Sequence, residues 1–155
     1  MSALNAFSLS GQVAIVTGGG AGIGRSIAEL FSEAGAAVVV SDLKQETAEQ
    51  VASGIQAAGG RAVGLACDVT NPQARQALVD AAIAAFGKVN ILVNNAGGGG
   101  PKPFDMPMET FVWAYELNVF SMFNLTQLCA PHMQAAGGGA VLYISSMAGE
   151  YKHQR

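Results

Sequence analysis

Glycines near the N-terminus have the spacing that the pyrophosphate of a dinucleotide requires. Gly18, Gly22 and Gly24, with Ile23 between the last two, lie in the run TGGGAGIG. Glycine lets the backbone turn tightly and approach phosphate oxygens, and free N–H groups at the start of the next helix point at the negative charge. A glycine-rich turn without a ligand is the alternative. The apolar segment before the run and the helical pattern after it favour nucleotide binding.

A carboxylate follows the next apolar segment. Asp42 comes twenty residues after Gly22, a position from which an acidic side chain accepts hydrogen bonds from the adenosine ribose hydroxyls and repels a 2′-phosphate. An ordinary aspartate that ends a strand is the alternative. We therefore expect the cofactor NAD, with Leu43 beside the same nucleotide. Arg25 and Lys44 are cations near that ribose, and they keep NADP open.

Two further strand ends carry residues that suit a nucleotide. Asp68 and Val69 follow a third apolar segment, where the carboxylate can receive the exocyclic amine of adenine. Alternatively, Asp68 caps the next helix. After a fourth apolar segment, Asn95, Ala96 and Gly97 place small residues where a flat ring must lie close to the backbone. Amides at strand ends also form local turns, but their position beside the glycine turn favours the cofactor.

Two polar residues are candidates for catalysis. Asn118 lies inside a long apolar helix, and its amide must be satisfied there: it either bonds a helix carbonyl or holds a water at a distorted turn. Ser146 follows the fifth apolar segment, where a hydroxyl can polarise a substrate carbonyl or simply cap a helix. The sequence has no metal-ligand spacing, no P-loop and no nucleophile–His–acid arrangement, so we expect no metal.

The elements that position these residues alternate along the chain. We expect strands at 13–16, 37–41, 62–67, 91–93 and 140–144, and helices at 26–31, 45–58, 72–86 and 108–134, the last with its helix propensity interrupted near Asn118 and Pro131. This order predicts an α/β fold, a doubly wound parallel sheet of Rossmann type with three layers, in one domain over residues 1–155. Ligands of such sheets bind beyond the carboxyl ends of the strands, where the polar residues gather.

Composition narrows the possible partners. Half of the 155 residues are hydrophobic and 12% are charged, which excludes disorder. The net charge is −3 and no basic run occurs, so nucleic acid is not an expected partner. No segment reaches the length of a membrane span and no charged region precedes an apolar N-terminal stretch, so we expect a cytoplasmic protein. Cys67 and Cys129 are expected to be buried thiols in that reducing compartment.

The motifs together resemble the short-chain dehydrogenase/reductase family. Its signature elements appear as the glycine turn, Asp42, Asp68-Val69, the run NNAG at 94–97, Asn118 and Ser145-Ser146. The resemblance implies an NAD(P)-dependent oxidoreductase that interconverts a secondary alcohol and a ketone, with Asn118 and Ser146 in the catalytic set. Residues 97–107 and 115–120 further resemble bacterial family members that oxidise the 7α-hydroxyl of bile acids with NAD. This implies a steroid substrate beside Gly99, Ser146 and Tyr151.

The family's chemistry also uses a Tyr-x-x-x-Lys pair on the helix after the serine, and the sequence reaches Arg155 before that point. Tyr151 and Lys152 are adjacent rather than four apart, so they do not share a helical face. We therefore expect the 155 residues to be the N-terminal part of a longer enzyme, without its C-terminal strands and helices, and inactive alone. A truncated product is the alternative. An apolar strand at 140–144 would otherwise be an uncovered edge.

The resemblance also implies a homotetramer, with the long helix at a main interface. Trp113, Tyr115, Phe120 and Phe123 recur along that helix, and a role in the core and in a subunit interface is favoured over a ligand site. Two alternatives to a hydroxysteroid dehydrogenase stay open. One is another short-chain reductase, acting on a 3-oxoacyl thioester or a sugar. The other is a nucleotide-binding fragment without turnover.

Overall fold

The structure contains every strand and helix that the sequence predicts. The computed structural model of the chain describes residues 6–99 and 103–146. The strands are β1 Val13–Thr17, β2 Ala37–Asp42, β3 Arg61–Ala66, β4 Ile91–Asn94 and β5 Ala140–Tyr143. The helices are α1 Gly22–Glu33, α2 Gln45–Ala57, α3 Pro72–Phe86, α4 Met108–Tyr115 and α5 Ser121–Ala135, with the π-helical turn η2 Glu116–Phe120 between the last two. Helix α1 begins at Gly22 rather than Ser26, because the end of the glycine run already forms its first turn.

The five strands form one parallel sheet in the order β3-β2-β1-β4-β5. The chain first moves outward from β1 to β3, then returns and continues on the other side of β1. The strand order therefore reverses between β1 and β4, and ligands of open α/β sheets bind at such a switch point, beyond the carboxyl ends of the strands. The doubly wound Rossmann-type prediction is confirmed.

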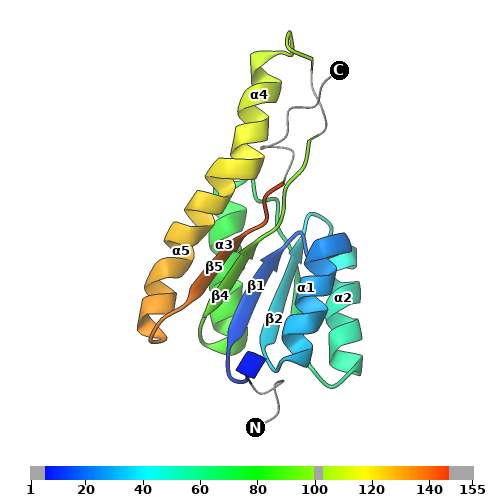
Figure 1. Cartoon of the computed structure of the whole chain (residues 1–155), viewed down its shortest axis with the longest axis vertical. Coiled ribbons are helices and arrows are strands. Elements are labelled where there is room, and N and C mark those ends of the chain that lie inside the picture. Colours follow the sequence, from blue (N-terminus) through cyan, green and yellow to red (C-terminus); the bar gives the residue numbers. More distant parts are fainter. Residues whose placement is uncertain (1–5, 100–102, 147–155) are drawn as a thin grey trace.

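Helices cover both faces of the sheet (Figure 1). Helices α1 and α2 pack on one face, and α3 and α5 pack on the other, which gives three layers. All five residues of β1 are buried, as is usual for parallel strands that are covered on both faces. At the sheet edge, β5 pairs only with β4 among the described strands, and three of its four residues are exposed.

Local signals set the helix boundaries. Asn71 caps α3, because its Oδ1 accepts the N–H groups of Gln73 and Ala74 at 2.9 and 3.1 Å, with Pro72 in the first turn. Helix α5 continues through Pro131 to Ala135, close to the predicted end at 134, although helix propensity falls at the proline, which lies on the exposed side of the helix. In the described part of the chain, no helix is both long and apolar enough to cross a membrane.

Both cysteines are buried free thiols, as predicted. Burial raises the pKa of Cys129, which lies on the core-facing side of α5, to about 12. It also raises the pKa of the Cys67 thiol, which lies directly after β3. Loss of water penalises the thiolate at both positions, so neither side chain is an activated nucleophile.

Candidate functional site

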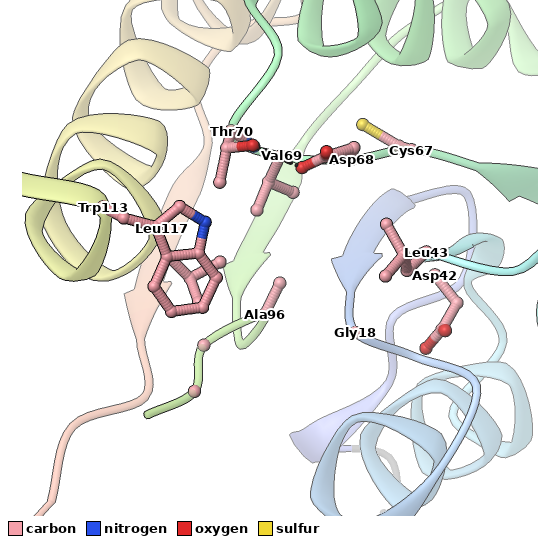
Figure 2. A pocket seen from close by; sticks show the side chains of 12 residues that line it. Gly18, Asp42, Leu43, Cys67, Asp68, Val69, Thr70, Ala96, Trp113 and Leu117 are labelled. Atoms are coloured by element: carbon pink, nitrogen blue, oxygen red, sulfur yellow. Dashed lines mark hydrogen bonds between the residues drawn. The ribbon is translucent and has the colours of Figure 1, made fainter. Parts of the chain in front are cut away.

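A cleft of about 410 Å³ opens at the switch point of the sheet (Figure 2). Its walls come from segments that follow four strands and from the long helix. The lining residues are Gly18, Asp42, Leu43, Cys67, Asp68, Val69, Thr70, Ala96, Gly97, Gly98, Trp113 and Leu117. Seven of these are predicted nucleotide-binding residues: Gly18, Asp42, Leu43, Asp68, Val69, Ala96 and Gly97. The structure thus gathers in one cleft these seven predicted residues, which are up to 79 positions apart, from Gly18 to Gly97.

Close packing explains the glycines of the turn. Gly18 has a φ of +61°, and a Cβ there would lie 2.9 Å from Asn95 Nδ2. A Cβ on Gly24 would overlap the carbonyl oxygen of Gly18 and lie 2.5 Å from the same Nδ2. Gly22, with a φ of +54°, faces open space instead, and Ile23 is 64% exposed. These last two residues do not line the cleft, although they belong to the turn at its rim.

Asn95 holds the glycine turn in place. Its Nδ2 donates to the carbonyl oxygens of Thr17 and Gly18 at 2.9 and 3.1 Å. The Thr17 hydroxyl donates to Val93 O at 3.2 Å and accepts the N–H groups of Asn95 and Ala96 at 3.1 and 3.0 Å. The Asn95 amide nitrogen is therefore occupied by backbone carbonyls, and Asn95 does not line the cleft. The structure gives it the turn-forming role that its residue type also predicted.

Asp42 is the last residue of β2, and its half-buried carboxylate already accepts three hydrogen bonds from the protein. Its Oδ2 accepts the Gly20 N–H at 3.0 Å, and its Oδ1 accepts the Thr47 hydroxyl at 3.1 Å and the Lys44 N–H at 3.4 Å. A carboxylate offers about four lone-pair sites. Among the described residues, one site on Oδ2 is left for a ligand hydroxyl at the cleft wall.

The segment after β3 forms a second polar wall. Asp68 Oδ1 accepts both the N–H and the hydroxyl of Thr70, at 2.9 and 2.7 Å. Asn71, not Asp68, caps α3, so the interpretation of Asp68 as the helix cap is wrong. Within the described part of the chain, both of these hydrogen bonds lie on Oδ1, which leaves Oδ2 of the exposed Asp68 open to the cleft.

A buried arginine that sequence reasoning missed lies behind this wall. The Arg75 side chain is 6% exposed. One terminal nitrogen donates to Val69 O at 2.5 Å and to Glu116 Oε1 at 3.0 Å, and its Nε donates to Asn124 Oδ1 at 2.8 Å. Arg75 therefore joins the segment after β3 to η2 and α5. The sequence does contain a sign of this burial. The apolar residues three, four and seven positions after Arg75 are buried, and this spacing places the arginine on the core-facing side of α3.

Asn118 lies in the π-helical turn η2 and ties it to the loop after β4. Its Nδ2 donates to Ala114 O at 2.8 Å and to Gly98 O at 3.0 Å, and its Oδ1 accepts the Gly98 N–H at 3.1 Å. The Ser121 hydroxyl donates to Leu117 O at 2.7 Å. Side chains thus satisfy carbonyls at the distorted turn. Both features expected of Asn118, a bond to a helix carbonyl and a helix distortion, are present.

The substrate-side candidates lie apart from the lining of the cleft. Ser146 is exposed and follows β5 at the same edge of the sheet, with a hydrogen-bonding partner of its own. Gly99 is exposed with a φ of +109°. Tyr151 lies outside the described residues. Across residues 6–99 and 103–146, no three His, Cys, Asp or Glu side chains gather in a way that would hold a metal ion.

The aromatic residues of the long helix are not core residues, contrary to that part of the prediction. Trp113, Tyr115, Phe120 and Phe123 are 44–62% exposed. Helix α4, which carries Trp113 and Tyr115, projects beyond the carboxyl ends of the strands (Figure 1), so no sheet lies beneath it to bury these two side chains. Trp113 instead lines the cleft, one helical turn before Leu117. The interface role is not tested by the single chain.

Comparison with known proteins agrees with this geometry. A family profile described as short chain dehydrogenase matches residues 12–155. The chain belongs to the short-chain dehydrogenase family. It is 59% identical over 145 residues to the 7α-hydroxysteroid dehydrogenase of Escherichia coli (strain K12) and 44% identical over 144 residues to the 4-formylbenzenesulfonate dehydrogenase of Comamonas testosteroni. These matches cover 94% and 92% of this chain, and both cover 57% of the relative.

A solved structure of this short-chain dehydrogenase family overlays on nearly the whole chain. It is a 7α-hydroxysteroid dehydrogenase complexed with NADH and 7-oxo glycochenodeoxycholic acid. The TM-score is 0.95 at 56% sequence identity, over 99% of this chain and 60% of that one. The chain thus spans little more than half the length of the relatives it matches. The likeness confirms the Rossmann-type fold over the whole described region.

Proposed function

We propose that this chain is part of an NAD-dependent oxidoreductase that interconverts the 7α-hydroxyl of a bile acid with the corresponding ketone. The single observation that carries the proposal is the 59% identity to the 7α-hydroxysteroid dehydrogenase of Escherichia coli, over nearly the whole chain. The TM-score of 0.95 with a family member that holds NADH and a 7-oxo bile acid supports both the cofactor and the substrate class. The relatives are longer, so the activity is proposed for the full-length protein.

The residues present fit the cofactor. Gly18 lines the cleft and packs so closely on Asn95 and Ala96 that a Cβ would not fit. This backbone-only turn supports pyrophosphate binding by the backbone from Gly18 to Gly24, Gly22 and Ile23 included. The open lone pair of Asp42 suits a ribose hydroxyl, beside Leu43. Asp68 and Val69 would hold adenine, and Ala96 and Gly97 would lie against the ring systems, on a turn that Asn95 fixes. When bound, NAD accepts a hydride from the alcohol.

The substrate side follows from the remaining candidates. Ser146 would orient the substrate oxygen with its hydroxyl, and Gly99 and Tyr151 would line the steroid. Asn118 would keep the loop at Gly98 and the distorted helix in the arrangement that the catalytic centre needs. We further propose a cytoplasmic homotetramer that binds neither nucleic acid nor membrane. Exposed aromatic side chains on the long helix support the assembly, and sedimentation of the full-length protein tests it.

Turnover by the full-length protein tests the function. NADH should form with bile acids that carry a 7α-hydroxyl and not with their 7β epimers, a matched pair that differs at one stereocentre. The same assay with a 3-oxoacyl thioester and with a sugar alcohol covers the other reductase alternative. Binding of NADH without turnover of any of these compounds would favour a nucleotide-binding module, and inactivity on the 7α-hydroxyl alone would refute the proposed substrate.

Replacing Asp42 with alanine is expected to weaken NAD binding about tenfold or more, and NADP binding less. The carboxylate would lose its hydrogen bonds to the ribose, and a bond to a charged group contributes about 1.5–3 kcal/mol. Its repulsion of a 2′-phosphate would also disappear. Arg25 does not offset this, because its Nε is bound to Glu29 at 2.8 Å on the exposed side of α1. Titration with both nucleotides measures the change.

The exposed Asp80 on α3 supplies a matched control, since its carboxylate bonds only Gln76 among the described residues. An Asp80→Ala variant should bind both nucleotides as the parent does. Equal losses of NAD and NADP affinity in Asp42→Ala would refute the ribose-reading role.

A further inference from the structure

One wall of the cleft is an indole that the functional assignment leaves unused. Trp113 on α4 and Leu117 on η2 are four positions apart and lie on the same face of the long helix. Across the cleft lies Leu43, and between the two sides run Asp68, Val69 and Thr70 (Figure 2). Both apolar side chains are open to the cleft, since Trp113 is 49% and Leu43 68% exposed.

The position of this wall is fixed at two places. Arg75 connects it to the segment after β3, because the same terminal nitrogen bonds Val69 O and the Glu116 carboxylate of η2. Asn118 connects η2 to Gly98 on the loop that forms the floor. These hydrogen bonds therefore fix the position of the indole relative to the segment after β3, although no sheet lies under α4.

The neighbourhood of the indole matches the adenosine half of a dinucleotide. The residues that share the cleft with it include Asp42, Leu43, Asp68 and Val69, which suit a ribose and a base. The substrate-side candidates Gly99 and Ser146 are not among them. An adenine ring has flat faces that pack on apolar and aromatic side chains, and a polar edge that the free Asp68 oxygen can reach. An aromatic wall supports such a ring regardless of its hydrogen bonds.

We propose that Trp113 contacts the adenine ring of the bound dinucleotide and so determines the affinity for its adenosine half. The inference rests on the proposed function, because it requires a dinucleotide in the cleft. It predicts a loss confined to ligands that carry adenosine. NADH and ADP-ribose carry it, whereas reduced nicotinamide mononucleotide carries only the other half.

The test is titration of the full-length protein and its Trp113→Ala variant with these three ligands. We expect the variant to bind NADH and ADP-ribose about tenfold more weakly, since a base stacked on an aromatic side chain loses affinity of this order on truncation. Binding of reduced nicotinamide mononucleotide should not change. A Trp113→Phe variant should recover most of the affinity, because a smaller aromatic face remains.

Val112 supplies the matched control. It is the preceding residue on α4, 54% exposed, and absent from the cleft lining, so Val112→Ala should bind all three ligands as the parent does. Equal losses for all three ligands in Trp113→Ala, or no loss for any, would overturn the inference while the proposed function stands. Failure of the parent protein to bind NADH would refute the proposed function itself, and the inference with it.

Discussion

Replacing Gly24 with alanine should abolish dinucleotide binding and destabilise the protein by about 1–3 kcal/mol. The new Cβ would overlap the carbonyl oxygen of Gly18 and approach Asn95 Nδ2 to 2.5 Å. Neither neighbour can move freely, because Asn95 is bonded to Thr17 O and Gly18 O and this network sets the turn. Relief of the clash must displace the start of α1, whose N–H groups are proposed to face the pyrophosphate.

Denaturant unfolding and NADH titration of the full-length protein measure both effects. Gly54→Ala is the matched control, because Gly54 lies in α2 with no atom within 4 Å of a built Cβ and no positive φ. That change should stabilise the protein by about 0.5–1 kcal/mol and leave NADH binding unaltered. Parent-like stability and binding in Gly24→Ala would show that the close approach at the turn is not required.

The second large effect is expected at Arg75. An Arg75→Met variant keeps most of the length and the apolar stem but removes three hydrogen bonds, to Val69 O, Glu116 and Asn124. Removal of one partner from a buried polar cluster leaves the others unsatisfied, and we expect a loss of about 2–4 kcal/mol in the free energy of unfolding. NADH should also bind more weakly, because the wall at Val69 would no longer be tied to η2.

Glu116→Gln separates the charge from the hydrogen bond. Its Oε1 can still accept from Arg75, and the side chain is 33% exposed, so the loss should stay near 1 kcal/mol or below. The double variant then gives the coupling energy of the pair. A cost for Arg75→Met no larger than that for Glu116→Gln would contradict the role assigned to the arginine.

Most of the fold could be predicted from short-range patterns. Runs such as VAIVT and AVVVSD are apolar at successive positions, which identifies parallel strands buried on both faces. The glycine run and the polar residues after each strand then locate the cleft, because the topology brings all those strand ends to one edge. These patterns involve residues that are close together in the chain, so they can be recognised in a single sequence.

The contacts of individual polar side chains could not be predicted in the same way. Arg75 meets Glu116 and Asn124, which are 41 and 49 positions away, and no local pattern names such partners. The sequence favours a cofactor contact for Asn95 over a turn-forming role, and only the position of the Thr17 and Gly18 carbonyls shows that its Nδ2 holds the turn. Trp113 looked like a core residue because apolar spacing on a helix normally marks the buried face, whereas α4 extends past the sheet.

The π-helical turn η2 holds one residue more than a turn of α-helix. This extra residue constrains the number of residues in the long helix. Met122 and Leu125 face the core in α5, and an unbroken α-helix would continue that face at 118, 115 and 111. Phe111 and Tyr115 are instead 42% and 44% exposed, while Thr110, Ala114 and Leu117 are half-buried. The two halves are thus out of phase by one residue. Deleting one residue within 116–120 would rotate α4 by about 100°, so the residue count there determines which side chains form the wall of the cleft.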